Sequence, residues 1–503
     1  MKTHIKRIRP SALIAGLGLM LAAPLTAQTF TTLHGFTASS GPYGTNSDGA
    51  NPQAGLILSG NTLYGTAASG GGSGYGTVFA INTDGTGFTN LHSFAPQAED
   101  GNNVATNIDG ANPSAVLILS SNTLYGTAKF GGGSGKGTVF KVNTDGTGFT
   151  TLHSFPTTPN YPGPSTNSDG AYPYGGLVLS GNTLYGTAAS GGSSGRGTVF
   201  AINTDGSTFT NLYSFTGDGF APEAGLVISG TNFYGAARFG GSSGNGTVFK
   251  INTDGTEFTN LHSFTAESGA YLTNSDGANP QAGLILSGNT LYGTTKYGGS
   301  SGRGTAFRVN IDGTGFANLH NFTRDNYNVT TGASTNSDGA DLRTGLIISG
   351  NALYGAAYGG GLSGKGTIFK VNTDGAGFTN LHSFPATSGG ATNSEGAAPA
   401  GLTLAGNTLY GTTQYGGNSA LGTVFRLSLA PRLAIIPSGT NVILTWPTNN
   451  AGFDYSGFTL QSSSNLMPSA VWSPVSPAPV VVSGQNAITN PISGAQKFYR
   501  LSQ

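Results

Sequence analysis

The stretch AGLILSGNTLYGTAASGGGSGYGTVFAINTDGTGFTNLHSF, residues 54–94, decides the fold, because it recurs with small changes seven times along the chain. Its G-T-V-F core, which reads GTAF in the fifth copy and GTIF in the sixth, begins at Gly76, Gly137, Gly197, Gly246, Gly304, Gly366 and Gly422. Successive cores lie 61, 60, 49, 58, 62 and 56 residues apart. Self-similarity at such a period is typical of a repeat architecture.

Each unit contains four short apolar runs that predict β-strands. In the first unit they are residues 55–58, 62–67, 76–82 and 88–94, rich in Thr, Val, Ile, Tyr and Phe and bounded by Gly, Asn or Asp. None of them has the apolar spacing of an amphipathic helix. The sequence therefore predicts an all-β fold.

The connectors within a unit differ in kind. Gly60-Asn61 joins the first two runs and is a two-residue hairpin signal, since both residue types tolerate a positive φ. N-T-D-G-T-G joins the third and fourth runs, where Asp84-Gly85 predicts an Asx turn followed by a left-handed glycine. A Gly-rich segment joins the second and third runs, and a long linker of variable length leads to the next unit.

Four antiparallel strands per unit at this period indicate a seven-bladed β-propeller. The last unit stops after its third strand, residues 422–428, whereas a lone fourth strand, residues 30–36, precedes the first complete unit. We expect this N-terminal strand to complete the last blade and to close the ring, because that pairing leaves no incomplete sheet edge.

Three motifs give the units a family resemblance: G-L-x-L-x-G-N-x-L-Y-G-T, G-G-x-S-G-x-G-T-V-F and N-x-D-G-x-x-F-x-x-L-H-S-F. The chain resembles the Gloeobacter/Verrucomicrobia (GloVer) tandem-repeat family of secreted choice-of-anchor proteins over residues 29–428. The resemblance implies a secreted repeat protein and no particular activity.

Composition and length divide the chain into three parts. Residues 1–27 predict a signal peptide, with basic residues followed by an apolar run, 12–23, that is too short to span a bilayer. Residues 28–429 are the repeat array, and residues 430–503 form short alternating strands after a linker marked by Pro431 and Pro437. This last part resembles a fibronectin type III-like β-sandwich. We expect an exported monomer, extracellular or on the cell surface, with the periplasm as the alternative.

Charge and cysteine content exclude several classes of function. Removal of the signal leaves 17 basic and 21 acidic side chains, and this acidic balance argues against nucleic acid as a partner. The chain contains no cysteine, which excludes disulfides and thiol chemistry. No segment after the signal predicts a transmembrane helix.

A ligand site is expected on the propeller face that carries the Gly-rich connectors and the variable linkers, because binding residues tend to lie on variable loops of a rigid scaffold. Aromatic and basic residues that differ between units gather beside those connectors, and such residues could stack on sugar rings or pack under neighbouring loops. The candidates are Tyr75, Lys129, Phe130, Arg196, Arg238, Phe239, Lys296, Tyr297, Arg303, Tyr358 and Tyr415.

The linkers carry a repeated T-N-S-D-G-A motif that allows two interpretations. Its carboxylates could bind calcium, or the motif could form an Asx turn that pins the long loop. The candidate carboxylates are Asp48, Asp109, Asp169, Asp276 and Asp338. We expect no cofactor, with calcium as the alternative, and we predict no catalytic residues.

Six of the seven histidines occupy one slot, L-H-S-F, and predict a structural role between blades; Tyr213 holds the seventh slot. The Gly-rich segments lack the G-x-x-x-x-G-K-[ST] pattern of a phosphate-binding loop and are expected to be bends. The first hypothesis for function is a non-catalytic protein that binds a glycan or a surface protein. The alternatives are a polysaccharide lyase or glycosidase and a structural spacer of the envelope.

Overall fold

The computed structural model describes residues 29–502 except 42–43, 100–103, 159–164, 331, 389–390, 430, 432, 451–452, 456, 466, 468–469 and 492–496. The predicted signal peptide lies outside these residues. The described residues form strands and loops and include no helix, and hence no helix able to cross a membrane. They divide into a larger unit, residues 31–405 with 409–426, and a smaller unit that contains residues 427–502.

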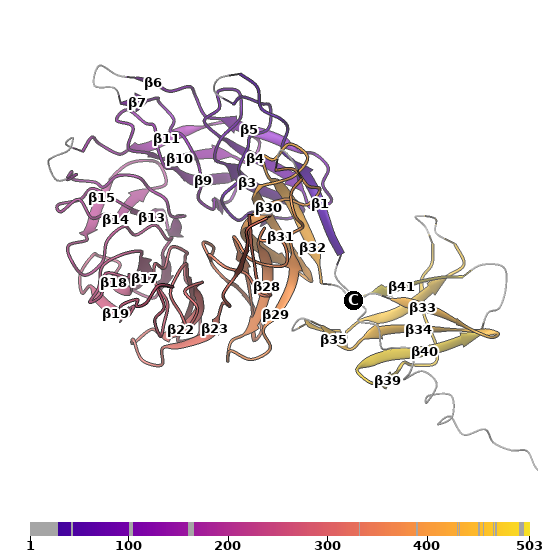
Figure 1. Ribbon diagram of the computed structural model, residues 1–503. Helices are drawn as coiled ribbons and strands as arrows, with labels where there is room; N and C mark the ends of the chain where they lie inside the picture. The colour runs from indigo at the N-terminus through magenta and orange to yellow at the C-terminus, as the bar shows by residue number, and fades with distance from the viewer. Residues whose placement is uncertain are drawn as a thin grey trace, which may run out of the picture. The chain divides into compact units, whose positions relative to one another are not determined.

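Seven four-stranded antiparallel sheets make up the repeat array, and each sheet is named here by its place along the chain (Figure 1). Their strands are, for sheet 1, β2 (Ile57–Ser59), β3 (Thr62–Ala67), β4 (Thr77–Asn82) and β5 (Thr89–Ser93); for sheet 2, β8 (Ile118–Ser120), β9 (Thr123–Ala128), β10 (Thr138–Asn143) and β11 (Thr150–Ser154); for sheet 3, β12 (Val178–Ser180), β13 (Thr183–Ala188), β14 (Thr198–Asn203) and β15 (Thr210–Ser214); for sheet 4, β16 (Val227–Ser229), β17 (Asn232–Ala237), β18 (Thr247–Asn252) and β19 (Thr259–Ser263); for sheet 5, β20 (Ile285–Ser287), β21 (Thr290–Thr295), β22 (Thr305–Asn310) and β23 (Ala317–Asn321); for sheet 6, β26 (Ile347–Ser349), β27 (Ala352–Ala357), β28 (Thr367–Asn372) and β29 (Thr379–Ser383); and for sheet 7, β30 (Ala397–Ala405), β31 (Thr408–Tyr415), β32 (Thr423–Ser428) and β1 (Thr29–Gly35).

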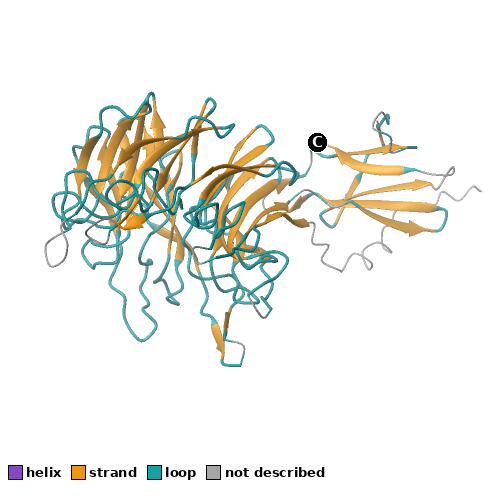
Figure 2. Cartoon of the chain, turned by 90° about the horizontal axis from the view of Figure 1, so that it is seen from above, coloured by secondary structure: helices purple, strands orange, loops and turns teal. Residues whose placement is uncertain are grey.

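The turns follow the chemistry of their residues. Asp84 Oδ1 accepts a hydrogen bond from the Thr86 backbone N–H at 2.9 Å, and Gly85 has a φ of 91°, so an Asx turn with a left-handed glycine joins β4 to β5. In the β2–β3 hairpin, Gly60 has a positive φ of 57°. Two linkers also contain short hairpins, β6 (Ala98–Glu99) with β7 (Ala105–Thr106) and β24 (Asn326–Asn328) with β25 (Ala333–Thr335). The long connectors gather on one side of the strands (Figure 2).

Each sheet packs its apolar face on the next sheet. Tyr64 and Val78 of sheet 1 share a core cluster with Leu124 and Phe140 of sheet 2, and corresponding clusters join sheets 2 to 6 in turn. Phe384, which follows β29 of sheet 6, meets Phe425 of sheet 7 with ring centroids 5.6 Å apart.

The two ends of the repeat array meet. Leu63 and Phe79 of sheet 1 pack with Tyr410 and Val424 of sheet 7. Strand β1, from the N-terminal end, lies beside β32 at the outer edge of sheet 7, and the Phe36 N–H just after it donates to the Gly422 carbonyl at 3.2 Å. The first and last parts of the array therefore share both a core and a sheet.

A histidine and a carboxylate join neighbouring sheets at the outer strands. His262 at the end of sheet 4 lies 2.9 Å from Asp276 in the following linker and stacks on Phe316 of sheet 5 at a centroid distance of 3.7 Å. The same pairing, with distances between 2.8 and 3.1 Å, recurs in five linkers, at His34–Asp48, His92–Asp109, His153–Asp169, His320–Asp338 and His382–Glu395. In the short linker, Tyr213 donates to Asp218 instead. The histidines of the L-H-S-F motif thus pair with the carboxylates of the linkers. The sequence analysis had considered these two sets of residues separately.

The linker carboxylates are stabilised in the ionised form. Burial opposes ionisation of Asp276, but hydrogen bonds from His262 and from the Thr265 side chain and backbone hold its pKa below the ordinary value. Asp48 and Asp338 have lowered pKa values for the same reasons.

The smaller unit contains two sheets that share one core. One sheet has the order β33 (Ala434–Ser438), β34 (Asn441–Pro447), β40 (Gln485–Pro491), β39 (Val480–Val482), and the other has the order β38 (Ser473–Pro474), β37 (Thr459–Ser463), β41 (Phe498–Ser502); β35 (Asn449–Asn450) and β36 (Phe453–Asp454) form a short pair. Trp446, 1% exposed, packs with Leu444, Leu460 and Ile488. Assigning Pro437 to a linker was wrong: it lies in the edge strand β33, where proline is tolerated because only one side of the strand is paired.

We predict that Gly65→Ala destabilises the protein by about 1–3 kcal/mol, because an added Cβ would lie 2.6 Å from the Phe79 ring and 2.7 Å from Leu56. Chemical denaturation of purified protein measures the loss. Gly72→Ala is the matched control, since nothing lies within 4 Å of its Cβ position. Equal stability of the two variants would contradict the packing described.

We predict that Asp276→Ala lowers the free energy of unfolding by about 1–3 kcal/mol, because His262 and the Thr265 N–H lose their acceptor. Asp254→Ala removes a carboxylate from an exposed turn and should cost much less. A loss no larger in Asp276→Ala than in this control would show that the pairing between sheets contributes little.

Stability should fall on acidification. The carboxylates of Asp48, Asp276 and Asp338 contribute stability that is complete above the unfolded pKa, near 3.8, and that is lost as pH falls through their lower folded pKa values. Burial also lowers the pKa of His153 and His382 despite their acidic partners, so both favour the unfolded state as pH falls below 6.5. Denaturation midpoints measured from pH 7 to pH 3 should decrease, most steeply below about pH 4; an increase on acidification would contradict this account.

Candidate binding site

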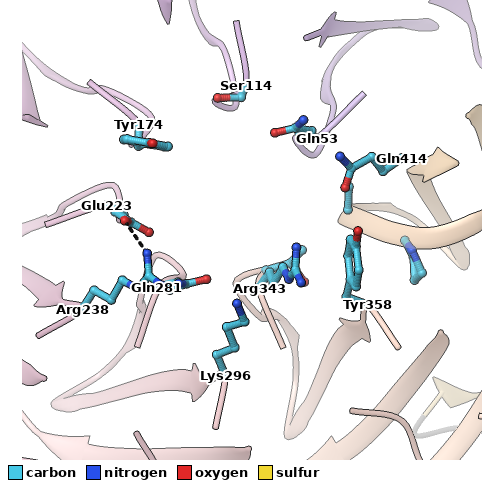
Figure 3. A pocket seen from close by; sticks show the side chains of 13 residues that line it. Gln53, Ser114, Tyr174, Glu223, Arg238, Gln281, Lys296, Arg343, Tyr358 and Gln414 are labelled. Carbon is cyan, nitrogen blue, oxygen red and sulfur yellow. Dashed lines mark hydrogen bonds and ion pairs between the residues drawn. The ribbon is translucent and has the colours of Figure 1, made fainter. Parts of the chain in front are cut away.

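A cavity of about 350 Å³ opens in the larger unit where several repeats meet (Figure 3). Its lining is mostly polar and consists of Gln53, Ser114, Tyr174, Glu223, Arg238, Gln281, Lys296, Arg343, Thr344, Tyr358, Pro399, Ala400 and Gln414. A second cavity of about 470 Å³ shares many of these residues and continues along the segments that lead into the first strands, where many residues are Ala or Gly. The two cavities therefore share the residues that lie just before the first strands.

One position in each repeat contributes a residue to the lining of the first cavity. It follows a proline, or Leu342 in sheet 6, just before the first strand, and its seven residues are Gln53, Ser114, Tyr174, Glu223, Gln281, Arg343 and Ala400. The residue before the proline has a positive φ in every repeat, between 53° and 60°. The backbone is thus the same in all seven repeats while the side chain presented to the cavity differs.

Each of these prolines rests on the repeat before it. A Cβ added to Gly76, whose φ is 106°, would lie 2.6 Å from Pro113, and the Asn112 N–H donates to the Tyr75 carbonyl at 2.9 Å. The same contact joins Gly422 of sheet 7 to Pro52 of sheet 1. Only glycine fits this close approach, so the core motif of one repeat positions the cavity residue of the next.

A second position, just after the second strand in sheets 4 to 6 and near the end of the longer strand β31 in sheet 7, adds Arg238, Lys296, Tyr358 and Gln414 to the lining. Lys129 occupies the same position in sheet 2, and its ammonium lies over the Tyr174 ring, 4.2 Å from the centroid. Three of the residues predicted from sequence, Arg238, Lys296 and Tyr358, are therefore brought together at the cavity.

The charged residues of the lining form ion pairs. Arg238 Nη1 donates to Glu223 at 2.9 Å, and its other N–H groups reach the Gln281 amide oxygen when that amide is oriented to accept them. Arg343 donates to both oxygens of Asp341, from Nε at 3.1 Å and from Nη2 at 2.6 Å. These bonds fix the guanidinium planes at the wall of the cavity.

Two tyrosines of the lining, Tyr174 and Tyr358, add hydroxyl donors. Arg343 lies over the Tyr358 ring, 3.7 Å from the centroid, and the Tyr358 and Tyr415 rings are 6.5 Å apart. Burial raises the pKa of Tyr358 to about 12, with a further contribution from its hydrogen bond to Tyr415. Burial also raises the pKa of Tyr174 to about 12. Both phenols are therefore neutral near pH 7.

The other predicted ligand residues lie outside the lining. Tyr75 packs against the core between sheets 1 and 2, and Phe130 meets Tyr172 edge-on at 5.7 Å. Phe239 stacks on Phe220, and Arg196 lies over that ring at 5.2 Å.

Three further candidates lie near the connectors. Arg303 is paired with Asp325, Tyr297 is 37% exposed beneath Lys296, and Tyr415 is 41% exposed beside Tyr358. These residues are spread over several repeats.

The calcium candidates are separated as well. Asp48, Asp109, Asp169, Asp276 and Asp338 each lie beside a different histidine. In the part of the chain that the structure describes, no three acidic, histidine or cysteine side chains form a metal-binding group. The loop is pinned by the asparagine of the motif, since Asn46 Oδ1 accepts hydrogen bonds from the Gly49 and Gly71 N–H groups at 2.9 and 2.8 Å.

Sequence reasoning missed the position after the proline, which supplies most of the cavity. The signal was present, because this residue reads Q, S, Y, E, Q, R and A in successive repeats, whereas the residue before it is proline in six of the seven. The prediction considered the connectors instead, where variation in length is more conspicuous.

The chain was compared with known proteins. A search of curated protein sequences finds no match. Among solved structures, an oligogalacturonate lyase from Vibrio parahaemolyticus has 9% identity and a TM-score of 0.45, covering 80% of this chain and 97% of its own. A puromycin-hydrolyzing peptidase from Mycobacterium tuberculosis has 13% identity and a TM-score of 0.43, covering 80% of this chain and 61% of its own. At these scores we transfer no activity from either protein.

The sequence profile of the Gloeobacter/Verrucomicrobia repeat matches residues 15–166 and 161–275. Together the two matches span more than half of the chain. The motifs from which the resemblance was predicted continue through the remaining repeats with the same strand pattern. The chain belongs to the Gloeobacter/Verrucomicrobia repeat family.

Proposed function

We propose that this protein is an exported, non-catalytic binding protein that holds a glycan in the cavity at the centre of a seven-bladed β-propeller. In this proposal the seven sheets are the blades, β1 closes the ring, and the smaller unit is a fibronectin type III-like sandwich. The signal peptide predicted for residues 1–27 would direct the chain to the cell surface or the extracellular space. A surface protein is the alternative partner.

The observation that carries the proposal is the convergence of one variable residue from each repeat on a single cavity. A purely structural spacer has no need for such variation at a position whose backbone is constant. The cavity volume of about 350 Å³ lies within the range of small-molecule sites. Amide, hydroxyl and guanidinium groups dominate its lining, and they suit the many hydroxyls of a sugar.

The arrangement favours binding over hydrolysis. Glycoside hydrolysis usually needs two carboxyl groups facing one bond. Glu223 lines the cavity but is bonded to Arg238, and Asp341 is held at both oxygens by Arg343. An assay for reducing-sugar release or for unsaturated products distinguishes the glycosidase and lyase alternatives from a binding protein.

The test is a glycan array followed by calorimetry with the mature protein, residues 28–503. We predict a saccharide ligand whose affinity falls about tenfold or more in the double variant Gln53→Ala, Gln414→Ala, because two amides that face the cavity are removed. Gln97→Ala, in an exposed linker, is the control and should bind normally. A blank array, or a ligand unaffected by the double variant, would argue against the proposal.

A further inference from the structure

The cavity is divided by charge. Figure 3 shows Ser114, Gln53 and Gln414 on one side and Glu223, Arg238, Lys296 and Arg343 on the other. The neutral side comes from repeats 1, 2 and 7, whereas the charged side comes from repeats 4, 5 and 6. A ligand that matches this cavity has hydroxyls at one end and a charge at the other.

The charged side has an excess of cations. Arg238, Lys296 and Arg343 lie there with two carboxylates, those of Glu223 and Asp341. Glu223 is bonded to Arg238, and Asp341 is bonded to Arg343 through two N–H groups. The two carboxylates therefore offset two of the three cations and leave one positive charge.

Lys296 provides this excess charge. Its ammonium lies 3.8 Å from Asp341, beyond hydrogen-bond distance, and no described residue accepts a hydrogen bond from it. The side chain is 11% exposed, and Figure 3 shows the nitrogen pointing into the cavity. Lys296 therefore has an ion-pair partner but no hydrogen-bond acceptor among the described residues, and an anionic group of a ligand could supply that acceptor.

Neighbouring groups extend the positive region. Because Arg343 bonds Asp341 through Nε and Nη2, its Nη1 is free of that pair. Lys296 and Arg343 both lie against the Asp341 carboxylate and both line the cavity. An anion in contact with Lys296 would thus also experience the Arg343 guanidinium.

We propose that the ligand is an acidic saccharide, a sugar bearing a carboxylate or a sulfate ester, whose anion is bound by Lys296 and Arg343 while its hydroxyls meet Gln53, Ser114 and Gln414. This inference rests on the proposed glycan-binding function. It specifies that function by ligand class and by orientation, since the anion faces repeats 5 and 6.

The experiment titrates the mature protein with size-matched oligosaccharides: neutral glucans, oligouronides and sulfated oligosaccharides. We expect one acidic series to bind at least about tenfold more tightly than the neutral one and to weaken with added salt. Equal affinity for neutral and acidic saccharides would overturn the acidic-ligand inference and leave the glycan-binding function intact. Failure of all series to bind would overturn both.

Variants assign the anion to its site. Lys296→Gln should reduce affinity for the acidic saccharide about tenfold or more and reduce the salt dependence. Lys365→Gln makes the same charge change in a Gly-rich connector outside the lining and should bind as the parent protein does. Unchanged affinity in a folded Lys296→Gln variant, with melting temperature as the check, would reject the assignment. If that variant fails to fold, the saccharide comparison on the parent protein still decides the ligand class.

Discussion

The contact between the core glycine of one repeat and the proline of the next determines both the assembly and the site. Gly76, with a φ of 106°, leaves only enough room for Pro113 to approach, and a side chain there would collide with it at 2.6 Å. The residue after the proline, which lies at or shortly before the first strand, is thereby positioned at the cavity. Because the same contact joins Gly422 to Pro52, the last repeat positions the first as each repeat positions its successor.

This constraint separates the residues that fold the chain from the residues that vary in the cavity lining. Side chains of the core, of the turns and of the outer-strand pairs must satisfy their neighbours in every repeat, so they recur. The residue after the proline is not held by such repeated contacts, and it differs in almost every repeat.

The short linker shows that a structural contact is kept even when its residues change. There Tyr213 replaces the histidine and still bonds Asp218, so the contact between an outer strand and a linker is retained.

Much of the fold could be predicted from sequence because its signals are local. Strand β3 begins and ends where the apolar run predicted, and the Asp84-Gly85 turn has the expected geometry. The pairing of His262 with Asp276 was missed because it depends on the path of a linker, which no local pattern encodes. The edge strand with Pro437 was missed because a proline suggests a linker. Proline is tolerated in this strand because the strand lies at the edge of its sheet, a position that the local sequence does not reveal.

Some of the residues singled out from the sequence line the cavity and others do not, and the reason is geometric. Arg238, Lys296 and Tyr358 could be singled out because they interrupt a repeated segment, but Phe130, Phe239 and Tyr297 interrupt it equally and lie outside the lining. Lys296 lines the cavity, whereas the ring of its neighbour Tyr297 lies 4.7 Å from the Lys296 ammonium and outside the lining. The repeat pattern is interrupted at both positions and does not show which of the two reaches the cavity.

The placement of the acidic side chains explains why a chain with no net charge can present a positive cavity. Its 21 acidic and 21 basic side chains balance overall, but many acids are committed to turns and to histidine pairs at the outer strands. At the cavity, by contrast, two carboxylates serve three cations. The carboxylates of the turns and of the histidine pairs lie away from the cavity, and solvent screens exposed charges over about 10 Å. The electric field in the cavity therefore depends mainly on the few charged groups that line it. Substitution of one residue per repeat can therefore change the charge of the cavity without disturbing the fold.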